Sequence, residues 1–194
     1  MSLVRAVYTT AIRLATPAIL LHLARRTRRQ TGTCDDWRAR LGYGPRVEGG
    51  AIWIHAASAG EIQAAAPLVA ALRTEHPLRL TCFTASGRAR ADRLLPGVDA
   101  ELAPLDLPGA WRRFFVRGRP RVVVLVESEL WPNLLAAARR AGVPVVLASA
   151  RLTPGSARRL ARVPGVAREL LGGLAQVLVQ TSADLERFVA LGLP

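Results

Sequence analysis

Short apolar runs alternate with longer mixed segments along most of the chain, and this pattern predicts strands and helices in turn. The apolar runs are rich in Val, Leu and Ile with little polar alternation, which is typical of strands buried on both faces. They lie at residues 51–55, 78–84, 100–103, 121–126, 145–148 and 176–180. The segments between them have the Ala and Leu spacing of helices, at 61–75, 86–95, 108–117, 132–141, 156–171 and 182–191.

This repetition predicts an α/β domain with an open, Rossmann-like parallel sheet and helices on both faces. Pro164 and Gly165 interrupt the fifth predicted helix and indicate a break there. In such sheets ligands bind at the carboxyl ends of the strands. Polar residues that directly follow an apolar run are therefore the candidates for a functional site.

The amino-terminal segment has a different character. Residues 3–24 are mostly apolar but are interrupted by Arg5, Arg13 and Pro17, and a spanning helix needs roughly 20 apolar residues. Four arginines follow at once, namely Arg25, Arg26, Arg28 and Arg29. The pattern favours a helix anchored on an anionic membrane surface over residues 1–30, with the following domain in the cytoplasm. Partial insertion, a cleavable signal peptide and a core-packed first helix are the alternatives.

Glycines are frequent in residues 31–50, which predicts a connector with one short helix around Trp37–Leu41. The globular domain is then expected over residues 51–194.

Charge narrows the set of partners. The chain carries 27 Lys and Arg residues, all of them Arg, against 14 acidic residues, for a net charge of +13. Such an excess attracts anionic lipids, phosphorylated substrates or nucleic acid. Aromatic residues make up only 5% and no nucleic-acid motif occurs, so a nucleic-acid partner is not expected. Cys34 and Cys82 have no metal-ligand spacing, which argues against a metal site and fits a reducing cytoplasm.

Three sets of polar residues follow apolar runs. After the first run, Ser58 and Gly60 form a small-residue turn and Glu61 stands at the start of a helix. Small residues permit close approach of a substrate, and free backbone amides lie at a helix start. Glu61 is then either a base at the mouth of a cleft or an acid favoured by the helix dipole.

Glu127 and Glu129 follow the most hydrophobic run, and Arg151 follows the next. We expect Glu127 and Glu129 to point to opposite faces, so that at most one of them faces the first turn. Arg151 is a candidate partner for one of them in a structural ion pair. The alternative is a set of carboxylates that converge for general-base catalysis on a hydroxyl.

Four stretches resemble, in order, the signatures of bacterial Kdo transferases, which transfer 3-deoxy-D-manno-oct-2-ulosonic acid (Kdo) from CMP-Kdo to lipid A precursors. Residues 53–61 resemble "WVHAxSxGE", and residues 105–109 resemble "PYDLPGA". Residues 126–134 resemble "ETELWPNL", and residues 150–158 resemble "ARLSxxSAxxY". An apolar amino-terminal segment followed by arginines is also similar to that family.

The resemblance implies one half of a GT-B glycosyltransferase, the half that binds the lipid A precursor (lipid IVA) at the cytoplasmic face of the inner membrane. It implies that Glu61 is the general base on the acceptor hydroxyl and that Glu127 supports the transition state. Glu129 would support the site without being catalytic. The expected acceptor-binding residues are Ser58, Gly60 and Arg151. CMP is displaced directly with inversion, in a step that needs no metal and no cofactor besides the donor CMP-Kdo.

The family chains continue into a second domain that binds CMP-Kdo, whereas this sequence ends at Pro194. We therefore expect the nucleotide-sugar domain to be absent and the 194 residues alone to be inactive. Two other functions stay open. One is another lipid-directed two-domain glycosyltransferase, and the other is a non-catalytic membrane-binding fragment.

Overall fold

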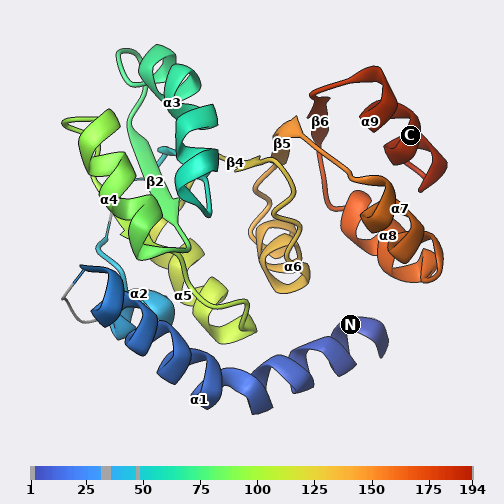
Figure 1. The fold of residues 1–194 in the computed structure, drawn as a ribbon, viewed down its shortest axis with the longest axis horizontal. Coiled ribbons are helices and arrows are strands. Elements are labelled where there is room, and N and C mark those ends of the chain that lie inside the picture. Colours follow the sequence, from blue (N-terminus) through green and yellow to red (C-terminus); the bar gives the residue numbers. More distant parts are fainter. Residues whose placement is uncertain (1–2, 32–35, 47–48, 194) are drawn as a thin grey trace.

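The sheet is parallel throughout and has six strands in the order β3-β2-β1-β4-β5-β6 (Figure 1). The computed structural model describes residues 3–31, 36–46 and 49–193. The strands are β1 (Ile52–His55), β2 (Leu78–Cys82), β3 (Ala100–Leu102), β4 (Val122–Val126), β5 (Val145–Ala150) and β6 (Gln176–Val179). This order is that of doubly wound dinucleotide-binding domains, so the predicted Rossmann-like fold is confirmed.

Helices cover both faces of the sheet. Those that follow the first strand are α3 (Ala59–Leu72), α4 (Ala85–Leu94), α5 (Pro108–Gly118), α6 (Pro132–Arg140), α7 (Pro154–Ala161), α8 (Pro164–Leu171) and α9 (Ser182–Ala190). Alternation along β1 shows the two layers: Ile52 and Ile54 pack with residues of α3 and α4, whereas Trp53 packs with α5, α6 and α8. The predicted break at Pro164 is confirmed as the start of α8.

Helix α1 (Leu3–Thr31) runs across the carboxyl edge of the sheet, where it contacts α4 and α6 (Figure 1). Leu20 and Leu23 of α1 pack against Leu105, which follows β3, and Phe83, which follows β2, packs against the same cluster. The opposite face of α1 is apolar and exposed, with Leu14 79% accessible. By length and composition the stretch Leu3–Arg29 could also cross a membrane, with a mean hydropathy of 1.3 over an 18-residue window. The helix therefore has one face on the domain and one face free.

The predicted connector contains the short helix α2 (Trp37–Arg40), which Asp36 caps through the amides of Arg38 and Ala39. The Arg40 side chain is fully buried and donates hydrogen bonds to the carbonyls of Ala103 and Phe83. This segment therefore packs into the domain rather than only linking it to α1. Cys34, named in the sequence analysis, lies outside the described residues.

Candidate active site

Glu61 lies in the first turn of α3, with its side chain 8% accessible. One carboxylate oxygen accepts a hydrogen bond from the Ala57 amide at 2.8 Å, and the other accepts one from the Ser58 hydroxyl at 2.9 Å. The Ser58 oxygen in turn accepts from the Glu61 amide, so the two residues cap the helix reciprocally. Helix α3 consequently starts at Ala59, two residues before the predicted start.

The cap orients the Glu61 carboxylate without neutralising it. No Arg forms an ion pair with Glu61 in the described part of the chain. Burial raises the pKa of the Glu61 carboxyl, the hydrogen bonds from Ala57 and Ser58 lower it, and the charge of Glu127 raises it. Each carboxylate oxygen retains a second acceptor position after one hydrogen bond. The group is thus able to accept a proton from a bound hydroxyl.

Glu127 directly follows β4 and has a φ of 63°. A positive φ is uncommon for a residue with a side chain, and such strain concentrates at functional sites. Ser149, near the end of the neighbouring strand β5, has a φ of 53°. Backbone strain therefore occurs near the carboxyl ends of two adjacent strands.

Strand alternation does not support the prediction that Glu127 and Glu129 point to opposite faces, because residues two apart on a strand share one face. Strand alternation ends at Val126, so it does not extend to these two acids. The charges of Glu61 and Glu127 both act on Glu129 and raise its pKa, after burial, which is the largest cause. Its pKa reaches about 7, although the Trp131 side chain donates a hydrogen bond that lowers it. The three carboxyl groups therefore lie close enough for their charges to interact.

The residues predicted to bind the acceptor lie near these acids, and Gly60 and Arg151 differ in what surrounds them. Gly60 is exposed, and a Cβ there would meet only the Ser58 hydroxyl, at 3.9 Å, so packing within the chain does not explain this glycine. Arg151 is exposed at the end of β5, and its carbonyl accepts a hydrogen bond from the Ser128 hydroxyl. Within residues 3–31, 36–46 and 49–193, Arg151 makes no ion pair with Glu127 or Glu129. Its guanidinium is available to a ligand.

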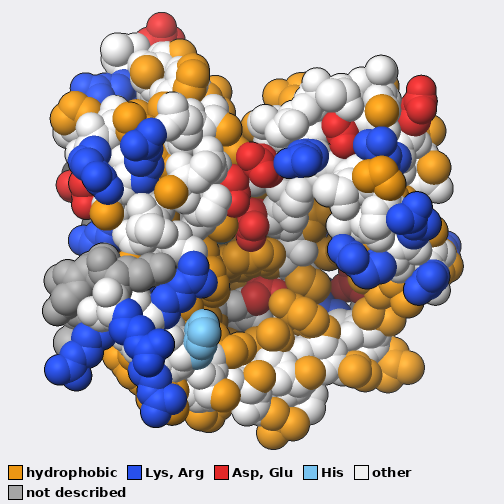
Figure 2. Space-filling view, in the orientation of Figure 1, with side chains coloured by type: hydrophobic (Ala, Val, Ile, Leu, Met, Phe, Trp, Pro, Cys, Tyr) orange, Lys and Arg blue, Asp and Glu red, His pale blue; other side chains and the backbone are white. Residues whose placement is uncertain are grey.

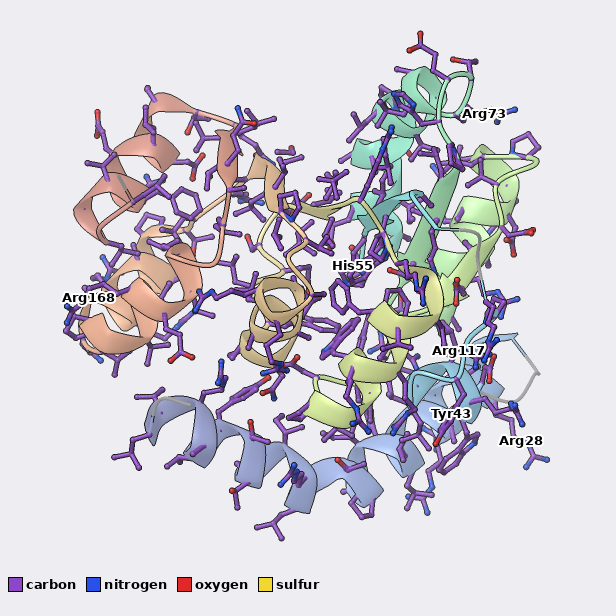
Figure 3. All side chains as sticks on the ribbon, turned by 180° about the vertical axis from the view of Figure 1, so that it is seen from behind. Arg28, Tyr43, His55, Arg73, Arg117 and Arg168 are labelled. Atoms are coloured by element: carbon purple, nitrogen blue, oxygen red, sulfur yellow. The ribbon has the colours of Figure 1, made fainter. Side chains whose placement is uncertain are left out.

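His55, at the end of β1, lies in the interior between α5 and α6 (Figure 3). The sequence alone indicated no role for this residue. Thr81 accepts a hydrogen bond from the Trp53 indole, and its hydroxyl pairs with the His55 Nδ1 at 2.8 Å. Burial lowers the pKa of His55 to about 4, so the ring is neutral near pH 7. The His55 ring contacts Trp131, with centroids 5.1 Å apart, and thereby supports the side chain that binds Glu129.

Asp106 is a second residue without a role from sequence. The backbone amides of Asn133 and Leu134, at the start of α6, both donate to its buried carboxylate. The Trp111 indole donates to the same group at 2.7 Å. The N-cap residue of α6 is Trp131, which has no side-chain acceptor, and this absence is the signal that a distant residue must supply the cap.

A groove separates two lobes of the molecule, with acidic side chains on its walls and hydrophobic side chains deeper inside (Figure 2). Helix α1 closes the far end of this groove. Two carboxylates of raised pKa, one buried and one half-buried, beside an apolar floor suit general-base catalysis on a hydroxyl carried by an amphipathic molecule. Arg151 adds a cation that could bind a phosphate.

Two comparisons with known proteins cover the part of the chain that contains these residues. A family model described as 3-deoxy-D-manno-octulosonic-acid transferase (kdotransferase) matches residues 35–194. A 3-deoxy-D-manno-octulosonic acid transferase of Bordetella pertussis is 42% identical over 97% of this chain. Proteins of the same description from Haemophilus influenzae and Chlamydia muridarum are 34% and 29% identical over 74% and 82% of it.

The chain spans only part of these relatives. It covers 47% of the Bordetella protein, 34% of the Haemophilus protein and 39% of the Chlamydia protein.

Proposed function

Since the chain belongs to the Kdo transferase family, we propose that it forms the acceptor-binding half of an enzyme that transfers Kdo from CMP-Kdo to a lipid A precursor, lipid IVA. Glu61 is the general base in this proposal. The environment of Glu61 supports this proposal best. Its carboxylate is buried at the carboxyl edge of the sheet and accepts two hydrogen bonds, and burial raises its pKa above the ordinary value.

The proposed step is a direct displacement. Glu61 takes the proton of the acceptor hydroxyl as the hydroxyl oxygen attacks the anomeric carbon of Kdo. The bond from that carbon to the CMP phosphate breaks, and CMP leaves with the bonding electrons, so the configuration inverts. Neither a metal nor a cofactor takes part in this proposal. Glu127 supports the transition state, and the hydrogen bond from the Trp131 side chain keeps Glu129 in position.

The acceptor side of the proposal draws on the polar residues at the strand ends. Ser58 orients the base, and exposed Gly60 leaves room beside it. Arg151 is able to bind a phosphate of the lipid A precursor. Exposed arginines at the end of α1 and the apolar outer face of that helix suit an anionic membrane at its cytoplasmic side. The donor CMP-Kdo would bind a second domain of the full-length enzyme.

The Glu61→Gln substitution tests the base. We expect transfer by the full-length enzyme to fall by about 10²-fold or more, because an amide cannot accept the hydroxyl proton. Transfer by the unsubstituted enzyme should decline as pH falls through the pKa of Glu61, which burial raises above 4.5. Initial rates across pH, with Kdo transfer followed by mass, measure both effects.

Glu75→Gln is the matched control, because Glu75 is exposed just beyond the end of α3. Its rate should stay within twofold of the unsubstituted enzyme. Circular dichroism must show both variants folded. Near-native turnover in Glu61→Gln would remove Glu61 from the mechanism.

A further inference from the structure

A cavity of about 250 Å³ lies between α1 and the carboxyl edge of the sheet. Helix α1 contributes Tyr8, Ile12 and Ile19 to its lining. The domain contributes Phe83, Leu105, Asp106 and Trp131. Apolar cavities of about 150 Å³ bind benzene in other proteins, so this one has room for a short length of hydrocarbon.

The cavity adjoins the candidate active site through one side chain. Trp131 lines the cavity, and the same residue donates a hydrogen bond to Glu129. Phe83 packs edge-on against Trp131, with ring centroids 5.2 Å apart, and continues the apolar wall. A molecule whose polar part lies at the carboxylates would therefore place an attached chain along Trp131 and Phe83.

Helix α1 separates this cavity from its own exposed apolar face. Ile12 and Ile19 are partly buried toward the domain, whereas Leu14 and Leu21 are exposed on the other side. The helix stays in this position through buried hydrogen bonds, from the Thr9 hydroxyl to Asn133 and from the Tyr8 hydroxyl to Asp106. One face thus belongs to the cavity while the other is free to meet lipid.

We propose that this cavity binds one hydrocarbon chain of the lipid acceptor, so that α1 forms part of the acceptor site. The inference rests on the proposed function, since it takes the acceptor to be an acylated lipid. Its support is the continuity between the carboxylate cluster, the apolar wall of Trp131 and Phe83, and the helix whose outer face is apolar. Burial of two methylenes accounts for about tenfold in affinity.

The test measures binding directly, without transfer. The probe is a soluble N-acyl glucosamine phosphate with a single dibrominated chain, because bromine quenches nearby tryptophan fluorescence. The protein carries Trp37→Phe, which removes a tryptophan that is 47% exposed. Trp53 and Trp111 are fully buried and Trp131 lines the cavity, so quenching that is lost in Trp131→Phe locates the chain beside Trp131.

Two matched double variants of α1 decide the outcome. I12F/I19F fills the cavity and should weaken binding of the brominated probe about tenfold or more. L14F/L21F makes the same chemical change on the exposed face and should stay within twofold. Should I12F/I19F fail to fold, the single variants I12F and L14F give the same comparison. Equal affinities in the inward and outward variants would overturn the proposal.

The source of the chain is distinguished by two further probes. Vesicles of dibrominated phosphatidylcholine should quench Trp131 less than the glucosamine probe does, and equal quenching would assign the cavity to bulk lipid instead. An N-acetyl version of the probe should not compete. The proposed function is judged separately, because loss of transfer in Glu61→Gln does not depend on this cavity.

Discussion

Three carboxyl groups act on one another at the carboxyl edge of the sheet. The charge of Glu127 raises the pKa of Glu61, and the charges of Glu61 and Glu127 raise the pKa of Glu129. Like charges in a partly buried site destabilise the folded chain, and such a cost is typical of sites selected for chemistry rather than stability. The neutral His55 ring and the Trp131 indole contribute a polar but uncharged support to this cluster.

The Glu129→Gln substitution should stabilise the protein at pH 8 by on the order of 2 kcal/mol. The pKa of Glu129 rises on folding from 4.5 to about 7. Its contribution to stability is therefore fully present below about pH 4.5 and is lost as pH rises through about 7. Glutamine stays neutral, so the variant should lose this part of the pH dependence. Urea unfolding between pH 5 and pH 8 measures it.

Exposed Glu186→Gln on α9 is the control, and it should keep the pH dependence of the unsubstituted protein. Identical pH slopes for the two variants would contradict the assignment of the raised pKa to Glu129.

Elements far apart in sequence share one buried polar centre. Asp106 caps α6 through two backbone amides, accepts from the Trp111 indole of α5, and accepts from the Tyr8 hydroxyl of α1. Burial raises the pKa of Asp106, while these hydrogen bonds oppose that shift. Since α6 begins just after the Glu127–Trp131 turn, the same contacts that position α1 also position one side of the candidate active site.

Thr9→Val should reduce the free energy of unfolding by about 1–2 kcal/mol, because it leaves the buried Asn133 side-chain oxygen without its hydrogen bond from Thr9. The neighbouring exposed residue offers a control, and Thr10→Val should change stability by less than about 0.5 kcal/mol. Hydrogen exchange should show faster opening of α1 in the first variant only. Unchanged protection of α1 in Thr9→Val would show that this bond does not hold the helix.

At the scale of the whole molecule, α1 connects regions on both sides of the groove. Arg5, near its start, pairs with Glu169 of α8 at 3.5 Å, and Leu20 and Leu23 pack against Leu105 beyond β3. The arginines at its other end are exposed, as is its apolar outer face. This distribution of charge and apolar surface suits a helix that lies in a membrane interface while it borders the site.

Binding to vesicles tests this orientation. L14D/L21D should abolish most binding to anionic vesicles, because it places charge on the outer face of α1. Replacing Arg25, Arg26, Arg28 and Arg29 by Gln should weaken binding by about 1 kcal/mol for each residue at low salt. L178D/L185D changes two exposed leucines of the distant β6–α9 region and should have no effect. Equal loss in both leucine pairs would argue against α1 as the membrane-facing element.

Local patterns predict most of the chain path, because periodicity and breakers act within a few residues. The apolar runs marked the strands, Pro164 marked the start of α8, and the acids that follow the first and fourth strands marked the site. The prediction that Glu127 and Glu129 point to opposite faces was not supported, because residues two apart on a strand share one face and both acids lie beyond β4, where Glu127 has a left-handed backbone. Nothing in the neighbouring sequence required that backbone conformation.

The sequence by itself determined the order of the elements, the parallel α/β class and the acids at strand ends, since each depends on local spacing and on how apolar side chains alternate. Tertiary structure alone decided that the charges of three carboxyl groups interact, that Asp106 caps a helix 26 residues further on, and that α1 lies over the carboxyl edge of the sheet. The physical reason is that these outcomes depend on burial and hydrogen bonds between segments distant in the chain, whose side chains meet only after the sheet has formed.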